Sequence, residues 1–199
     1  MRIVVIGSTG VIGKAVTRAL WERHEVIGVS RSSHPAVDIT EYASIARLFT
    51  TITNIDGVVS CAGNAAWKPL LQLTDDDFEM SLHDKLMGQV NVVRQALQRI
   101  NDRGSITVTS GVLAGRPMHG SGAVSLVNAG LEGFIRSAAL EAPRDIRVNI
   151  VSPPWVRETL IQLGMDPAAG LAAETVAKAY VAAVEGIHHG ETIHATQFA

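Results

Sequence analysis

The hydrophobic and polar positions of this chain follow two alternating patterns. Short runs of consecutive β-branched residues end in glycine or in small polar residues, as expected for strands that are buried on both faces. Between these runs, apolar residues recur three or four positions apart, which is typical of one face of a helix. The runs predict strands at residues 3–6, 25–29, 56–60, 105–109, 146–151 and 192–195, and a short further strand at residues 37–39.

Helical spacing predicts helices over residues 10–23, 42–50, 74–100, 124–141 and 174–184. Strands that alternate with helices in this way form a parallel sheet covered on both faces. We therefore expect an α/β fold: a Rossmann-type, doubly wound parallel sheet in three layers, as a single domain over residues 1–199. A parallel crossover needs about a dozen residues, more than lie between 29 and 37. Either the strand at 37–39 is vestigial or that connection is an unusually tight loop.

Composition and charge exclude several classes of partner. The formal net charge is −2 and no block of Lys or Arg occurs, so neither a nucleic acid nor an anionic membrane is expected as a partner. Cys61 is the only cysteine, which leaves no internal disulfide and no reason to expect secretion. The first apolar run is too short for a signal peptide or a membrane span. We expect a soluble, cytoplasmic protein without a metal site, because no third ligand is spaced to join His188 and His189.

Three glycines lie between the first strand and the first helix. Gly7 permits a tight turn, Gly10 lets a pyrophosphate approach the backbone, and Gly13 lets the helix pack closely on the strand. The start of the helix then offers unpaired N–H groups and a positive dipole to the phosphates. The segment predicted to bind a dinucleotide comprises Gly7, Ser8, Thr9, Gly10, Val11, Ile12 and Gly13. The alternative is that the glycines serve only the turn.

The residues after the second strand indicate which dinucleotide binds. An acidic residue there would pair with the ribose 2′-hydroxyl of NAD. This chain has Ser30, Arg31 and Ser32 instead, and a guanidinium group with two hydroxyls suits a 2′-phosphate. We therefore expect NADP(H) as the cofactor. The alternative is that Arg31 is a solvated arginine in a loop.

Further motifs carry a resemblance to a known family. The glycine turn, Asp38-Ile39-Thr40, Ser60-Cys61-Ala62-Gly63, and the segment 146–156 with its Pro153-Pro154 turn together resemble the short-chain dehydrogenase/reductase family over nearly the whole chain. Pro154 stands where the family has a glycine. The resemblance implies further cofactor contacts at Asp38, Ile39, Cys61, Ala62, Gly63, Pro153 and Val156.

The catalytic positions depart from the family pattern of Asn, Ser, Tyr and Lys. In that family a nearby Lys favours the phenolate of the Tyr, which can then act as an acid or a base near neutral pH. The register of the helix at 124–141 puts Val124 in the place of the Tyr and Asn128 in the place of the Lys. Gly111 falls at the Ser position, with Ser110 adjacent, and Lys85 falls at the Asn position.

Lys85 and Asn128 look like a reciprocal exchange of the family's Asn and Lys. We expect the Lys85 ammonium to reach the ribose hydroxyls and name Ser110, Lys85 and Asn128 as the candidate catalytic residues, with water as a further proton carrier. The alternative is that Lys85 lies on a helix surface and Asn128 is a small polar packing residue.

These observations lead to one expected function and two alternatives. We expect an NADP(H)-dependent oxidoreductase that acts on a small carbonyl or alcohol substrate by a non-standard proton relay. The first alternative is a catalytically inactive NADP(H)-binding or sensor protein, and the second is a scaffold whose glycine turn stays empty. The resemblance also implies a homodimer or homotetramer through the two long helices, where small residues allow close packing.

Overall fold

A sheet of six parallel strands forms the middle layer of the protein, with the strand order β2-β1-β3-β4-β5-β6. The computed structural model describes all residues from 1 to 199. The strands are β1 (Arg2–Ile6), β2 (Glu25–Val29), β3 (Gly57–Ser60), β4 (Ser105–Thr109), β5 (Arg147–Ser152) and β6 (Thr192–His194). The order reverses direction between β1 and β3, which is where doubly wound sheets bind their ligands.

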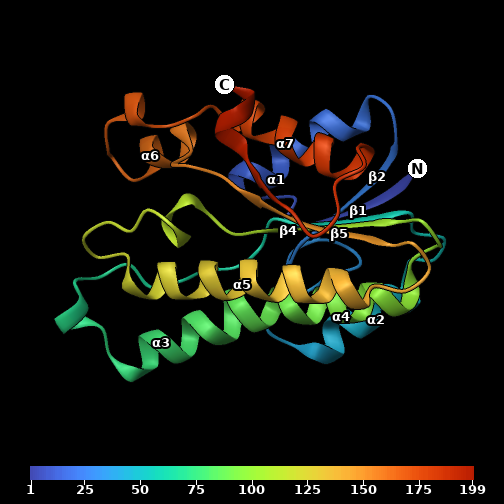
Figure 1. The fold of residues 1–199 in the computed structure, drawn as a ribbon, viewed down its shortest axis with the longest axis horizontal. Helices are drawn as coiled ribbons and strands as arrows, with labels where there is room; N and C mark the ends of the chain where they lie inside the picture. Colours follow the sequence, from blue (N-terminus) through green and yellow to red (C-terminus); the bar gives the residue numbers. More distant parts are fainter.

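Helices cover both faces of this sheet, as the alternating pattern predicts (Figure 1). On one face lie α1 (Val11–Trp21) and α7 (Ala173–Glu185), and on the other lie α2 (Tyr42–Thr51), α4 (Gly88–Arg99) and α5 (Gly122–Glu141). Successive residues of β1 contribute to separate cores because strand side chains alternate between faces. Ile3 and Val5 pack with α1 and α7, whereas Val4 and Ile6 pack on the opposite side.

The three-layer parallel fold is confirmed, but the short strand expected at 37–39 is wrong. The segment is a loop, and β2 forms the edge of the sheet. Hydrogen bonds close this loop tightly: the Ser30 N–H donates to the Ser33 hydroxyl at 2.8 Å, and the Val37 N–H donates to the Ser30 carbonyl at 2.9 Å. Val37 and Ile39 are buried in the core nonetheless, so they supply apolar side chains without forming a strand.

The long helix expected over 74–100 is interrupted. It begins at α3 (Asp75–Ser81), where Thr74 and Asp77 form a reciprocal capping box, passes through a π-helical segment at Leu82–Met87, and continues as α4. A π-helical turn inserts an extra residue, which sequence periodicity does not reveal. The helix expected from Val124 begins two residues earlier, at Gly122.

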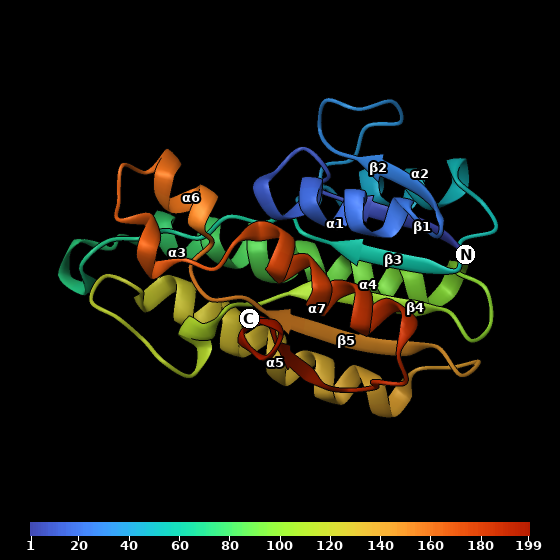
Figure 2. The ribbon, with the colours of Figure 1, turned by 90° about the horizontal axis from the view of Figure 1, so that it is seen from above.

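A further helix, α6 (Arg157–Gln162), occurs in the segment after β5 for which no element was expected. Figure 2 shows α6 and α3 beyond the ends toward which the strand arrows point. The last strand is shorter than expected, because residues 195–198 form a 3₁₀ turn. No helix of this protein is both long enough and apolar enough to cross a membrane.

Candidate functional site

The turn between β1 and α1 requires glycine at two positions. Gly7 has a φ of +82°, a left-handed conformation that other residues rarely adopt. A Cβ atom on Gly13 would lie 2.0 Å from the Gly7 carbonyl oxygen, which leaves no room for any side chain. The close approach of helix to strand that the glycine pattern predicts is therefore present.

The first turn of α1 offers donors that have no partner inside the protein. The N–H groups of Val11, Ile12 and Gly13 donate to no acceptor of the chain, and Gly10 caps the helix without a side chain. The Ser8 hydroxyl donates to the Val29 carbonyl at 3.3 Å and so already has an acceptor. Backbone N–H groups and the helix dipole, more than hydroxyls, make this turn suitable for phosphate.

In the loop after β2, hydrogen bonds hold the serines in place, whereas the Arg31 side chain is unpaired. The Ser30 and Ser32 hydroxyls lie 3.2 Å apart, and the exposed Arg31 makes no ion pair or hydrogen bond. Asp38 accepts hydrogen bonds from the Thr40 N–H at 2.9 Å and the Thr40 hydroxyl at 2.8 Å, which lower the pKa of its carboxyl below the usual value.

A cavity of about 730 Å³ opens at the carboxyl ends of β3, β4 and β5. Parallel α/β sheets bind ligands at this end. Nine of the residues predicted to be catalytic or to bind the cofactor line the cavity: Ile12, Cys61, Ala62, Gly63, Lys85, Ser110, Asn128, Pro153 and Val156. The other predicted cofactor residues lie outside its lining: Gly7, Ser8, Thr9, Gly10, Val11, Gly13, Ser30, Arg31, Ser32, Asp38 and Ile39.

Lys85 enters this cavity from the π-helical segment. Gly63 has a φ of +127°, and a Cβ atom on it would lie 3.0 Å from Lys85 Cα, so a glycine suits the position beside the lysine stem. The Lys85 ammonium donates to the Ser110 carbonyl at 3.4 Å. Burial lowers the pKa of Lys85 to about 8, against the opposing effect of the nearby Asp84 carboxylate. The ammonium therefore titrates close to physiological pH.

Asn128 occupies the space that a side chain at position 111 would need. A Cβ atom on Gly111 would lie 3.0 Å from Asn128 Nδ2. Asn128 is buried, and its Oδ1 atom has no hydrogen-bond donor within the protein. A buried acceptor without a donor is costly, so this oxygen is suited to a hydroxyl of a bound molecule.

Ser110 lines the cavity, but its proton is directed elsewhere. Its hydroxyl donates to the Glu132 carboxylate on α5 at 2.8 Å. The end of β4 that carries it is held by the buried Gln89 side chain, which donates to the Thr109 carbonyl and accepts from the Thr109 N–H, both at 2.8 Å. The Ser110 hydroxyl therefore reaches a substrate only if it leaves Glu132.

No tyrosine lines the cavity. Val124 lines the cavity, whereas Tyr42 and Tyr180 do not. Tyr180 is fully buried on α7, where its hydroxyl donates to Thr109 Oγ1 at 2.7 Å and that hydroxyl in turn donates to the Ser60 carbonyl at 2.6 Å. Burial raises the pKa of Tyr180 well above its ordinary value, so it is a structural donor.

Sequence reasoning missed the aromatic and apolar wall of the cavity. Trp67 and Trp155 line it with their ring centroids 5.3 Å apart, and Thr159, Leu163 and Met165 from α6 and the residues after it also contribute. A signal was available: both tryptophans follow strands, β3 and β5, whose carboxyl ends meet at the same edge of the sheet.

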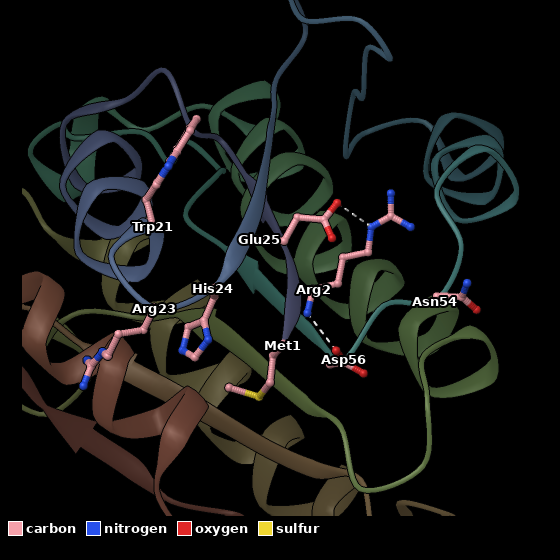
Figure 3. A pocket seen from close by; sticks show the side chains of 8 residues that line it. All are labelled: Met1, Arg2, Trp21, Arg23, His24, Glu25, Asn54 and Asp56. Atoms are coloured by element: carbon pink, nitrogen blue, oxygen red, sulfur yellow. Dashed lines mark hydrogen bonds and ion pairs between the residues drawn. The ribbon is translucent and has the colours of Figure 1, made fainter.

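A second cavity, of about 760 Å³, lies at the opposite, amino end of the sheet (Figure 3). Its polar groups are largely paired with one another. The Arg2 N–H donates to Asp56 at 2.7 Å, and the Arg2 guanidinium pairs with Glu25 at 3.0 Å. Arg23 and His24 both pair with Glu185. We place the functional site at the carboxyl end, where unpaired donors, an acceptor and a cation converge.

The family described as enoyl-(acyl carrier protein) reductase matches residues 12–187 of the chain. Carbonyl reductase family member 4 of Danio rerio is 30% identical over 198 residues, which cover 88% of this chain and 81% of that protein. The chain belongs to the short-chain dehydrogenase/reductase superfamily. A reductase of Mycobacterium tuberculosis that acts on a hexahydroindene-carboxyl-CoA is 29% identical, and the match covers 68% of this chain and 55% of that protein.

Solved structures agree with the fold. The protein lin1944 of Listeria innocua has a TM-score of 0.92 and 34% identity, covering 98% of each chain. A small-chain dehydrogenase in complex with NADPH has a TM-score of 0.85 and 24% identity, covering 98% of this chain and 95% of that one, which supports the fold alone.

The superfamily uses nicotinamide dinucleotides, and the residues of this chain fit one. The unpaired N–H groups of α1 suit a pyrophosphate, Gly7 and Gly13 allow the tight turn and the close packing of α1 on the strand, and Asn128 Oδ1 is an acceptor that lacks a donor. No three His, Cys, Asp or Glu side chains gather where they could hold a metal ion.

Proposed function

We propose that this protein is an NADP(H)-dependent oxidoreductase that reduces a small carbonyl substrate without the family's tyrosine. One observation carries the proposal: the Lys85 ammonium lines the same cavity as Asn128, the residue that replaces the family's lysine. The cavity thus keeps a cation although the usual lysine position has lost its charge.

The roles follow from the contacts. The turn at Gly7–Gly13 would hold the pyrophosphate, and the unpaired Arg31 would hold a 2′-phosphate, which supports NADP(H) over NAD(H). When bound, the nicotinamide would supply the hydride. Lys85 stabilises negative charge that develops on the substrate oxygen, and Asn128 Oδ1 accepts a hydrogen bond from a hydroxyl of the bound molecule. Ser110 is a poorer proton source while Glu132 holds its hydroxyl.

Val124 is the observation that favours a second candidate. An alkyl side chain in the position of the tyrosine cannot exchange a proton, so a catalytically inactive NADP(H)-binding or sensor protein would have this cavity too. The two candidates differ in turnover and share the binding of NADP(H).

One experiment tests both. Cofactor-stripped protein is titrated with NADPH and separately with NADH, with calorimetry as the readout, for the wild type and for Arg31→Ala. We expect about tenfold or more preference for NADPH, lost in Arg31→Ala. Substrate-dependent NADPH oxidation is then screened over carbonyl compounds. Tight NADPH binding with no turnover would favour the inactive candidate, and binding of NADH alone would overturn the role of Arg31.

We further propose a cytoplasmic homodimer or homotetramer formed through α4 and α5. Support comes from the small residues on exposed positions of α5, such as Ala129 and Gly130, which allow a second helix to approach closely. Sedimentation of the wild type and of Ala129→Trp tests this, since a bulky side chain in the contact should yield monomers.

A further inference from the structure

One edge of the sheet is open at β2. The sheet begins at this strand, whereas the usual doubly wound order places a further strand beyond the second one. In this chain the residues that follow β2 form a tight loop, and no strand covers the edge. Figure 2 shows β2 at the outer side of the sheet.

The outward backbone groups of β2 have no partner. The Glu25 N–H donates to β1, at the Met1 carbonyl, over 3.1 Å. Backbone groups alternate in direction along a strand, so Val26 and Gly28 point their N–H and C=O groups away from the sheet. No group of the chain bonds to these four groups. Unpaired groups of this kind form a template for another strand.

The residues of β2 do not protect this edge. Natural sheets often protect an edge strand with lysine, proline or a bulge. β2 contains neither lysine nor proline, and all five of its residues pair with β1 in continuous register. Its single charge, on Glu25, is already paired with Arg2 at 3.0 Å. The edge is therefore able to pair with a further strand.

The helix beside this edge has an exposed stripe. α1 packs on both β1 and β2. A groove of about 520 Å³ lies along its outer side and is lined by Ser8, Lys14, Thr17, Arg18, Trp21 and Glu22. Trp21 is 68% exposed, and Thr17 Oγ1 has no hydrogen-bond partner. The surface next to the open edge thus also lacks a partner.

We infer that the open edge of β2 binds a second copy of this chain, with the two β2 strands antiparallel and one sheet continuous through both copies. Val26 of each copy then exchanges two backbone hydrogen bonds with Gly28 of the other, and Ile27 lies opposite Ile27. This register uses every outward backbone group of both strands. The contact is separate from the one proposed through α4 and α5, and it does not depend on the proposed activity.

The same arrangement brings the two α1 helices together. A two-fold axis perpendicular to the sheet relates the antiparallel strands, so both helices lie on the same side of the joined sheet. Neighbouring strands are about 4.8 Å apart, so two helices that each rest on β1 and β2 lie about 10 Å apart, which is the distance of packed helices. The exposed Trp21 is then covered by the second copy.

Charges along α1 are complementary in this orientation. The two helices are antiparallel, so Lys14 near the start of one lies beside Glu22 at the end of the other. Neither side chain has an ion-pair partner within its own chain. Arg18 lies near the axis, and its pairing with Glu174 of its own chain at 3.5 Å reduces the repulsion between the two copies.

Sedimentation over a range of concentrations tests the contact. Two bonded residues in each strand make a short contact, so we expect the mass of the wild type to double between about 1 and 300 μM protein. Val26→Pro removes an outward N–H without removing a bond to β1 and should abolish the doubling. Val26→Ala, which keeps the N–H, is the matched control. No doubling in the wild type, or a doubling that persists in Val26→Pro, would overturn the proposal.

Amide hydrogen exchange locates the contact and needs no variant. At the concentration where the mass has doubled, the Val26 and Gly28 amides should exchange about tenfold more slowly or less than that rate. The Ile27 amide, which faces β1, should be slow at every concentration. Unchanged exchange at Val26 and Gly28 would overturn the pairing of the strands.

Charge reversal tests the orientation of the helices. Lys14→Glu places like charges beside each other and should weaken the association by about tenfold, and adding Glu22→Lys should restore it. Lys178→Glu, at an exposed position of α7, is the matched control and should have no effect. Equal weakening in the single and the double variant would overturn the antiparallel arrangement.

Discussion

The turn at Gly7–Gly13 and the catalytic positions around Val124 lie at the same edge of one sheet but differ in what determines them. In the turn, backbone geometry decides: a Cβ atom on Gly13 would lie 2.0 Å from the Gly7 carbonyl oxygen. Around Val124, side chains line the cavity, and the register proposed from the sequence places Val124, Asn128, Gly111 and Lys85 at the catalytic positions. The account therefore rests on backbone geometry in the turn and on the identity of side chains around Val124.

The largest expected effect on stability comes from a substitution in the turn at Gly7–Gly13. Gly13→Val places two methyl groups where no Cβ atom fits, and we expect a loss of about 3 kcal/mol or more in the free energy of unfolding. NADPH binding should disappear with it. Gly115→Ala is the matched control, because a Cβ atom there meets nothing within 4 Å. Denaturant unfolding checks both variants. A stable Gly13→Val protein that binds NADPH would show that backbone geometry does not determine the turn at Gly7–Gly13.

The position of the end of β4, beside the catalytic positions, depends on Gln89. Gln89→Leu leaves the buried N–H and C=O of Thr109 without partners, which should cost about 2–4 kcal/mol. Gln98→Leu, at an exposed position of the same helix, should change stability by less than about 0.5 kcal/mol. If urea unfolding finds the two variants equally stable, Gln89 does not hold the end of β4.

Lys85 should make stability depend on pH. Burial lowers its pKa to about 8 in the folded protein, below its value of about 10.4 in the unfolded chain. Between these values the unfolded chain binds more protons, so stability should rise with pH, by about 1–3 kcal/mol in total. The measurement is the difference in unfolding free energy between wild type and Lys85→Met across this range. A flat difference would show that Lys85 is not desolvated.

The smallest effect should come from Tyr180→Phe. The variant removes the donor to Thr109 Oγ1 and should cost about 1 kcal/mol. NADPH-dependent turnover should persist, because Tyr180 does not line the cavity. Loss of turnover in a folded variant would make Tyr180 the missing proton donor, in conflict with its structural role.

The sequence predicts the parallel fold well because buried strands and amphipathic helices leave strong local patterns. It does not predict the π-helical turn at Leu82–Met87 or helix α6, since neither has a distinct periodicity. Val37 and Ile39 are misassigned because their apolar character reflects burial in a loop.

The candidate site is only partly visible in sequence. The register at 124–141 gives Val124 and Asn128, and the structure brings Asn128 and Lys85 to one cavity. Two contacts join residues that are distant along the chain. Asn128 lies close to Gly111, and the Ser110 hydroxyl donates to Glu132. Such contacts depend on how helices pack, which no local pattern encodes.

The pH profile of NADPH-dependent carbonyl reduction tests the central claim most directly. The account predicts that kcat of the wild type falls as pH rises through about 8, where Lys85 loses its charge, and that Lys85→Arg stays active well above that pH. A Lys85→Met variant with the rate and pH profile of the wild type would contradict it, because the cavity would then need no cation at Lys85.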